Sequence, residues 1–135
     1  MIISQQDASK ATVFSRKLSA FNARRAGDPE YQEVFLVAVD DDQKELGGVL
    51  AFKDWNWLNI EVVFVEEESR GQGLGSALLK AAEGWGIENG CTRSLLDTFS
   101  FQSVSFYLRH GYEEFGRLAN FPEGHERIFM SRWLT

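Results

Sequence analysis

Residues Leu58 to Leu79 read LNIEVVFVEEESRGQGLGSALL and contain three consecutive patterns. The first, from Asn59 to Val65, is rich in β-branched and aromatic residues and is bounded by an acidic run, which predicts a strand. The second is a loop with Gly71, Gly73 and Gly75. Glycine has no side chain, so such a loop lets backbone N–H groups come close to a ligand.

The third pattern is a helix that begins directly after this loop. Leu74, Leu78, Ala82 and Trp85 fall on one helical face. The first N–H groups of a helix have no partner within the helix, and the helix dipole favours negative charge there. A glycine-rich loop that leads into a helix is therefore an anion site, and Arg70 adds a positive charge at its mouth. These patterns together predict binding of a phosphate or pyrophosphate.

Two common phosphate motifs fit this loop poorly. The ATP-type loop needs Lys and then Ser or Thr after its last glycine, and no Lys follows Gly75. The dinucleotide motif GxGxxG fits at Gly71 and Gly73 but has Ser76 at its third glycine position. Asp97 lies about where the ribose-binding carboxylate of that motif would be, so a dinucleotide-binding oxidoreductase stays open as an alternative.

A third motif fits without adjustment. Arg70–Gly75, RGQGLG, resembles the signature [Arg/Gln]-x-x-Gly-x-[Gly/Ala] of the GNAT acyltransferase superfamily. Phe106–Tyr112, FYLRHGY, resembles the second signature of that family, an aromatic-Tyr pair followed by Gly and an aromatic residue. The 37 residues from Arg70 to Tyr107 have room for the helix, strand and helix start that the family places between the two signatures.

The resemblance implies one α/β domain with the GNAT fold over residues 1–135. Its mixed central sheet has about six to seven strands, is flanked by helices and contains a splayed parallel strand pair. The sequence patterns agree with this order of elements. They predict an amphipathic helix with Phe14, Leu18 and Phe21 on one face over residues 7–25, strands over 33–40, 45–52, 59–65, 93–98, 112–118 and 126–134, and two further helices, over about 74–89 and before Gly111.

The resemblance also implies that acetyl-CoA is the co-substrate, with its thioester end between the two splayed strands. Backbone groups of Phe64 and Val65 are then expected to pair with the pantetheine arm. The residues expected to hold the pyrophosphate are Arg70, Gly71, Gln72, Gly73, Leu74, Gly75 and Ser76. The family often has Asn seven residues before its tyrosine; this chain has Ser100 there, so we expect Ser100 or Gln102 to make that cofactor contact.

Tyr107 matches the general acid of the family, a phenol that protonates the leaving thiolate. Its alternative role is packing beside Phe106. Glu61 is the candidate general base, because an acidic residue within an apolar strand is costly to bury without a purpose. Its alternative is an exposed position near the strand start. Asp97 either lines the same opening or caps a turn.

Composition limits the remaining function classes. Hydrophobic residues make up 44% of the chain and charged residues 25%, as in soluble globular proteins. The net charge of −6 argues against nucleic acid as a partner. One cysteine and two histidines give no metal signature, and without an apolar span or leader we expect no membrane contact and a cytoplasmic location.

The acceptor is less defined than the co-substrate. We expect a small-molecule or peptide amine, and the resemblance leaves room for a homodimer. A cofactor-binding module without catalysis, acting as a sensor or partner-binding domain, stays open as a second alternative.

Overall fold

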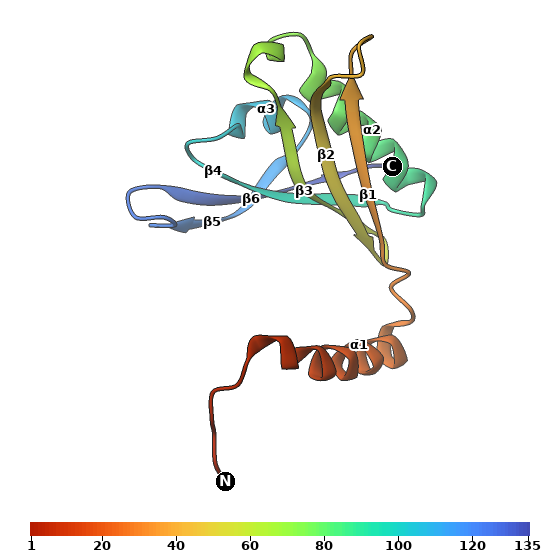
Figure 1. Ribbon diagram of the computed structural model, residues 1–135, viewed down its shortest axis with the longest axis vertical. Coiled ribbons are helices and arrows are strands. Elements are labelled where there is room, and N and C mark those ends of the chain that lie inside the picture. Colours follow the sequence, from red (N-terminus) through yellow and green to blue (C-terminus); the bar gives the residue numbers. More distant parts are fainter.

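The computed structural model describes all 135 residues and contains one six-stranded sheet with helices beside it (Figure 1). The strand order is β1-β2-β3-β4-β6-β5, and every neighbouring pair is antiparallel except β3 and β4. The elements are η1 Ala8–Ala11, α1 Thr12–Ala26, β1 Gln32–Val39, β2 Glu45–Asp54, β3 Trp57–Val65, η2 Glu67–Ser69, α2 Leu74–Glu88, β4 Arg93–Phe99, α3 Val104–Arg109, β5 Glu113–Ala119 and β6 Glu126–Trp133.

The strands and helices follow one another in the predicted order, and they form a three-stranded meander, a parallel crossover through α2 and a closing hairpin. The predicted number of strands and the parallel pairing of β3 with β4 are also confirmed. A doubly wound dinucleotide domain has a largely parallel sheet, whereas only one pair of strands is parallel here, so the dinucleotide alternative is wrong.

The parallel pair β3 and β4 is joined over only three residues of each strand. The paired residues are Trp57 with Arg93, Leu58 with Ser94, and Asn59 with Leu95. Beyond these, β3 stays paired with β2 and β4 stays paired with β6, so the two strands separate toward their carboxyl ends. A bulge accompanies the separation: the pairing shifts between Leu50 and Ala51, and Glu61 is the extra residue on β3.

The main core lies between α2 and one face of β1–β4. Val49, Ala51, Leu58 and Leu79 are fully buried there. Gly86 lets α2 approach the sheet closely, because a Cβ at this position would lie 3.1 Å from Cδ2 of Leu58. Of the apolar face predicted for this helix, Leu78 and Ala82 are buried in this core and Trp85 packs against it.

A buried polar network fastens α2 to the second half of the sheet. The hydroxyl of Tyr112 is 2.9 Å from Glu83 Oε2 and 2.8 Å from Ser94 Oγ. Arg132 Nη1 donates to the Glu83 carboxylate at 3.2 Å and to the His110 carbonyl at 2.9 Å. Burial and the nearby Glu83 carboxylate raise the pKa of Tyr112, so this phenol stays protonated.

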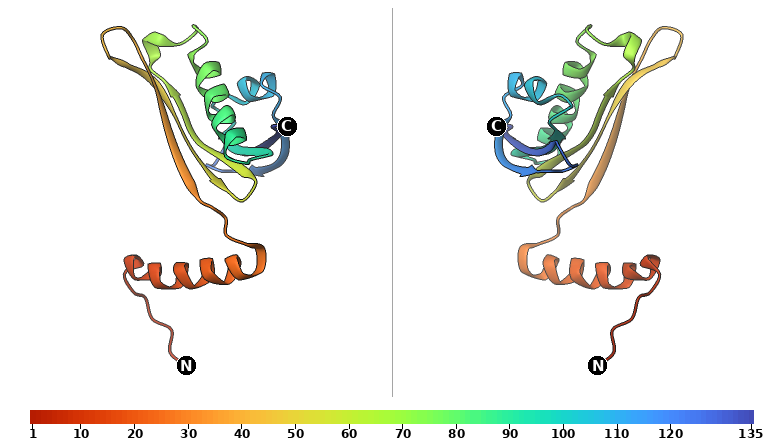
Figure 2. Two further views of the ribbon diagram at one scale, coloured as in Figure 1. Left: turned by 90° about the vertical axis from the view of Figure 1, so that its right-hand side faces the viewer. Right: turned by 90° about the vertical axis from the view of Figure 1, so that its left-hand side faces the viewer.

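Helix α1 forms where a helix was predicted but stands apart from the rest of the chain (Figures 1 and 2). None of its residues is buried, and η1 is the element that it mainly contacts. The linker after α1 is held by the β2–β3 turn: Trp55 Nε1 donates to the Gly27 carbonyl at 3.0 Å, and Trp55 N donates to the Pro29 carbonyl at 2.8 Å. The longest helices, α1 and α2, have 15 residues each, which is shorter than a membrane-spanning helix.

Candidate active site

The glycine-rich loop takes the conformation that its sequence predicts. Gly71 and Gly73 have φ angles of +77° and +83°, a region that other residues rarely occupy. Gly73 is the N-cap of α2, which begins at Leu74, and no side chain caps this end. Gly75 lies in the first turn of the helix, where its Cα faces the ring of Phe106.

Six consecutive backbone N–H groups, from Gly71 to Ser76, donate no hydrogen bond within the chain. The first N–H of this region that has an acceptor is that of Ala77, which donates to the Gly73 carbonyl at 3.0 Å. A row of free donors at a helix N-terminus, on a loop that is largely exposed, is well suited to an anion with several oxygens, such as a pyrophosphate.

Arg70 lies beside this row and folds back toward β3. Its Nε donates to the Val65 carbonyl at 2.9 Å, and its guanidinium lies 5.6 Å from the centre of the Phe64 ring. The Val65 carbonyl, which we expect to pair with a ligand, therefore already accepts a hydrogen bond in this structure. A pantetheine arm would have to displace Arg70 from it or use other backbone groups of β3.

A cleft of about 370 Å³ opens where β3 and β4 separate. Asn59 and Glu61 line it from β3, and Asp97 lines it from β4. Arg127 on β6 binds Asp97 through Nε at 2.7 Å, and Asp97 raises the pKa of Arg127. Of the two carboxylates in the cleft, only that of Glu61 lacks an ion-pair partner.

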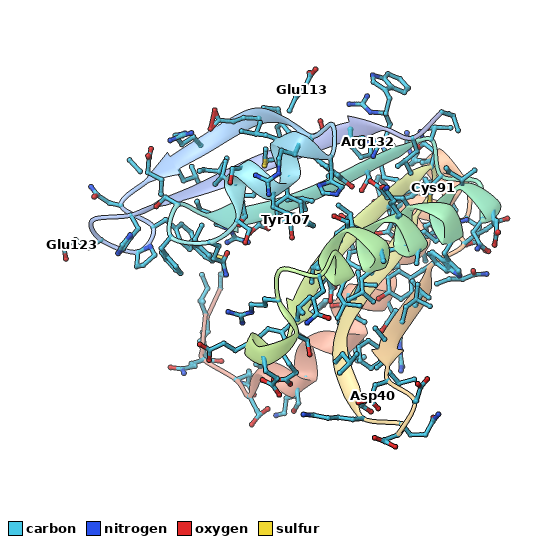
Figure 3. The ribbon with its side chains drawn as sticks, turned by 90° about the horizontal axis from the view of Figure 1, so that it is seen from above. Asp40, Cys91, Tyr107, Glu113, Glu123 and Arg132 are labelled. Carbon is cyan, nitrogen blue, oxygen red and sulfur yellow. The ribbon has the colours of Figure 1, made fainter.

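Tyr107 lies on the side of α3 that faces α2, as Figure 3 shows. Its ring packs edge-on against Phe106 and Tyr112, at centre distances of 5.1 and 5.9 Å. Burial raises the pKa of Tyr107 above 10.0, so its hydroxyl carries a proton at neutral pH. The hydroxyl makes no hydrogen bond within the chain, and Arg93 Nε is the only side-chain polar atom that is both fully buried and unpaired. The Tyr107 hydroxyl thus remains open to a ligand.

Comparison with known proteins assigns the chain to a family. The model of the Acetyltransferase (GNAT) family matches residues 5–112, which is most of the chain. The chain belongs to the GNAT family.

Relatives across bacteria agree with this assignment. The chain is 27% identical to the acetyltransferase Atu2258 of Agrobacterium fabrum, over 93% of this chain and 92% of that one. It is 35% identical to the blasticidin-S acetyltransferase of Streptomyces morookaense over 68% of this chain and 69% of that one. A crystal structure of an acetyltransferase from Bacillus cereus ATCC 14579 superposes with a TM-score of 0.93 at 32% identity, covering 98% of this chain and 97% of that one.

As a GNAT N-acetyltransferase, the protein is an enzyme that uses acetyl-CoA. The predicted family and the predicted GNAT fold are thereby confirmed. A cofactor-binding module without catalysis is not needed to explain the loop. The free N–H groups from Gly71 to Ser76 and the adjacent Arg70 fit the pyrophosphate of this co-substrate.

Two GNAT positions that we expect to contact the cofactor have local partners instead. Ser100 Oγ accepts a hydrogen bond from the Glu126 N–H at 2.9 Å. Gln102 Oε1 accepts from the Phe99 N–H at 2.9 Å and from the Thr98 hydroxyl at 3.2 Å. Both side chains shape the turn after β4, and the amide nitrogen of Gln102 and the hydroxyl proton of Ser100 stay available to a ligand.

Three further residues near the GNAT site are not evident from the motifs. His110 links α3 to the segment Arg70–Ser76, which we call the anion loop. Its Nδ1 lies 2.7 Å from the Phe106 carbonyl, and its Nε2 lies 2.8 Å from Ser76 Oγ. Tyr31 donates to Glu33 at 2.8 Å, and this bond, with smaller contributions from the Glu61 and Asp54 carboxylates, raises the Tyr31 pKa. Alternation along the strands places Glu33 on the same side of the sheet as the cleft, but no motif marks it.

Proposed function

We propose that this enzyme acetylates a cationic amine by direct attack of the amine on acetyl-CoA, with both substrates bound at once. The observation that carries the proposal is the order of two features along β3: Glu61, a carboxylate without an ion-pair partner, lines the cleft from this strand, and the six free N–H groups follow the end of the strand. Anion recognition and cation recognition thus lie on two sides of the splayed strand pair.

The acetyl-CoA side is formed by the loop and by β3. The N–H groups from Gly71 to Ser76 bind the pyrophosphate oxygens, with the guanidinium of Arg70 beside them. The unpaired edge of β3 near Phe64 and Val65 directs the pantetheine arm into the gap between the strands. Ser100 and the amide nitrogen of Gln102, which follow the end of β4, contact the cofactor from the other strand of the pair.

The acceptor side is acidic. Glu61 lies in the cleft, and Glu33 and Asp54 lie near enough to act with it on the Tyr31 hydroxyl. Because Arg127 neutralises Asp97, Glu61 is the carboxylate that is free to attract an ammonium. This distribution favours amines that keep a positive charge at neutral pH.

The proposed reaction needs three proton transfers. The acceptor ammonium gives a proton to the carboxylate of Glu61, directly or through water, and becomes a nucleophilic amine. The new C–N bond forms at the thioester carbon as the C–S bond breaks, and the electron pair of that bond leaves on sulfur. The Tyr107 hydroxyl gives its proton to this thiolate, so coenzyme A leaves as the thiol. The acylated nitrogen then gives up its second proton, which returns through water to the Tyr107 phenolate, so that a neutral amide forms and the phenol is restored.

The test is an acetyl-transfer assay with a panel of acceptors, measured by release of free coenzyme A thiol. The panel contains polyamines, aminoglycosides, amino acids, peptides with free N-termini and blasticidin S, which is included because a relative is named for it. We expect turnover of one or more cationic amines, and a fall in kcat/KM of about a hundredfold in Glu61→Gln.

Glu67→Gln is the matched control, since Glu67 is an exposed carboxylate in η2 outside the cleft. It should leave kcat/KM unchanged. Equal activity of Glu61→Gln and the wild-type enzyme would remove Glu61 from the mechanism, and a preference for neutral or anionic acceptors would overturn the proposed substrate class.

A further inference from the structure

Helix α1 carries an apolar stripe that nothing in its own chain covers. Phe14, Leu18 and Phe21 follow one another at helical spacing and are 72%, 60% and 46% exposed. A helix with such a stripe is stabilised mainly by packing that stripe against another surface. The helix in this structure therefore lacks the surface on which it normally depends.

The same chain has an uncovered apolar sheet face. Helices α2 and α3 lie on one side of β1–β3, and the other side is bare, as both views of Figure 2 show. Phe35 and Val37 on β1 and Val62 and Phe64 on β3 are exposed on this bare face. These four side chains surround a hollow of about 170 Å³. Gly48 lies at its base, and a Cβ added to Gly48 would lie 3.0 Å from the Phe35 ring, so the glycine lets this ring pack closely on β2. We call this surface the open face.

The linker holds α1 away from the open face of its own chain. The two hydrogen bonds from Trp55 fix the carbonyls of Gly27 and Pro29 at the β2–β3 turn. Glu30 N donates to Asp28 Oδ1 at 2.8 Å, and the Glu30 carboxylate lies 3.6 Å from Lys53 Nζ. These contacts anchor the linker at the β2–β3 turn and set the place from which α1 leaves the sheet.

Helix α1 and the open face carry opposite charges. Residues 1–26 contain five basic residues and one acidic residue, a net charge of +4, whereas residues 27–135 carry a net charge of −10. Glu45 and Glu66 border the hollow of the open face, and Glu33 and Glu61 lie nearby on the same strands. Lys53 is the only basic residue within β1–β3, and its Nζ donates to the Asn89 carbonyl on the other side of the sheet. A basic helix and an acidic apolar face attract each other.

The extended position of α1 is shared with the Bacillus cereus acetyltransferase. Residues 1–31 make up nearly a quarter of the chain, so a TM-score of 0.93 over 98% of the chain is reached only if most of them superpose. Two sequences that are 32% identical thus hold this helix in the same place outside the body. A position retained in this way indicates a function for the displaced helix.

We propose that two copies of the chain exchange α1, each laying the stripe of Phe14, Leu18 and Phe21 on the open face of the other. Such a two-fold exchange is closed, because each copy gives one helix and receives one. It buries both apolar surfaces and brings the basic helix onto the acidic sheet. The open face continues along β3 to Glu61, so the exchanged helix also forms a wall of the acceptor cleft; this last point rests on the proposed function.

The oligomeric state is tested with the full-length chain and one pair of variants. Light scattering during size-exclusion chromatography should give twice the chain mass of 15.3 kDa at micromolar concentration. Leu18→Glu should shift the protein to the monomer with its sheet intact, because Leu18 is exposed and is not part of the core of its own chain. Ser19→Glu is the matched control: it adds the same charge about 135° away from the stripe and should leave the dimer unchanged.

Cross-linking distinguishes exchange from other dimers. A tagged chain with Leu18→Cys is co-expressed with an untagged chain with Val62→Cys and treated with a short bis-maleimide; Cys91 is buried and does not compete. We expect a tagged–untagged product, and little product when Ser19→Cys replaces Leu18→Cys. The exchange would be overturned by a monomeric wild-type chain, by a dimer that Leu18→Glu leaves intact, or by the absence of the tagged–untagged product.

The contribution of the exchanged helix to the acceptor site is measured separately, by steady-state kinetics. In monomeric Leu18→Glu we expect the acceptor KM to rise several-fold and the affinity for acetyl-CoA to stay the same. If the wild-type dimer exchanges its helices but monomeric Leu18→Glu has an unchanged acceptor KM, the exchange stands and the exchanged helix is not a wall of the acceptor cleft. Absence of any acetyl transfer by an exchanged dimer would count against the proposed function alone.

Discussion

Nε of Arg70 donates a 2.9 Å hydrogen bond to the carbonyl of Val65, the last residue of β3. This contact keeps a guanidinium at the end of the splayed strand and next to the free N–H groups of the anion loop. The Arg70 side chain is exposed, so it can turn from the Val65 carbonyl to a bound phosphate without moving the backbone. The contact to Val65 uses Nε alone, so Nη1 and Nη2 are free to donate to a bound phosphate even before the side chain turns.

Removal of this guanidinium should weaken acetyl-CoA binding. A charge-assisted hydrogen bond contributes about 1.5–3 kcal/mol, so Arg70→Ala should raise the Kd roughly ten- to a hundredfold. Isothermal titration measures this change. Lys80→Ala removes an exposed positive charge from α2 away from the loop and should leave the Kd unchanged; equal effects of the two variants would mean that Arg70 acts only through net charge.

The two glycines Gly73 and Gly84 should respond to alanine in opposite ways. Gly73 has a φ of +83°, and an L-residue in this conformation costs about 1–2 kcal/mol, so Gly73→Ala should lower the Tm by a few degrees and weaken acetyl-CoA binding. Gly84 lies within α2 with open space around its Cα, so Gly84→Ala should raise stability by up to about 1 kcal/mol. Thermal unfolding of both variants checks this, and a stabilised Gly73→Ala would contradict the strained loop.

Stability should depend on pH through the buried tyrosines. The pKa of Tyr112 in the folded chain is raised above its ordinary value of 10.0 by burial. The unfolded chain then loses this proton first, so the stabilisation is complete below pH 10 and falls above it, by up to about 1.4 kcal/mol per pH unit. Urea unfolding between pH 9 and pH 11 measures the slope. Tyr112→Phe should make it shallower, and an unchanged slope would contradict this assignment.

Tyr107→Phe should impair the chemical step and leave the fold intact. The Tyr107 hydroxyl makes no hydrogen bond within the chain, so its loss should change the Tm little. Loss of a general acid lowers kcat by about a hundredfold or more, while the affinity for acetyl-CoA stays the same. Tyr112→Phe is the opposite case, because it loses bonds to Glu83 and Ser94 and should reduce stability but not kcat. Full turnover by Tyr107→Phe would exclude Tyr107 as the acid.

The parts of the site that sequence alone could predict are those that follow one another along the chain. The strand before Arg70, the glycines with positive φ and the start of α2 are local features, and local spacing determines them. Glu61 was predicted as a site residue because it is an acidic residue within an apolar strand, which is also a local feature. Its position as the extra residue of a bulge depends on pairing with Leu50 and Ala51, which no local pattern specifies.

Contacts between distant residues lay beyond the sequence patterns. Glu83 looks like an ordinary polar residue of a helix, yet it is buried because Tyr112 and Arg132, far along the chain, supply its partners. Arg127 neutralises Asp97 from a strand that follows the motifs. The periodicity of Phe14 and Leu18 shows which residues share a helical face, but it cannot show that this face is not covered by the rest of its own chain.

The most direct test of the account is the response of individual backbone amides to acetyl-CoA. Amide chemical shifts of the isotope-labelled chain would be followed by NMR during titration. We predict that the largest changes, with slowed hydrogen exchange, fall on the N–H groups from Gly71 to Ser76, which have no partner in the free chain. Binding that leaves these amides unchanged, or no binding by the folded chain, would contradict the assignment of this loop as the cofactor site.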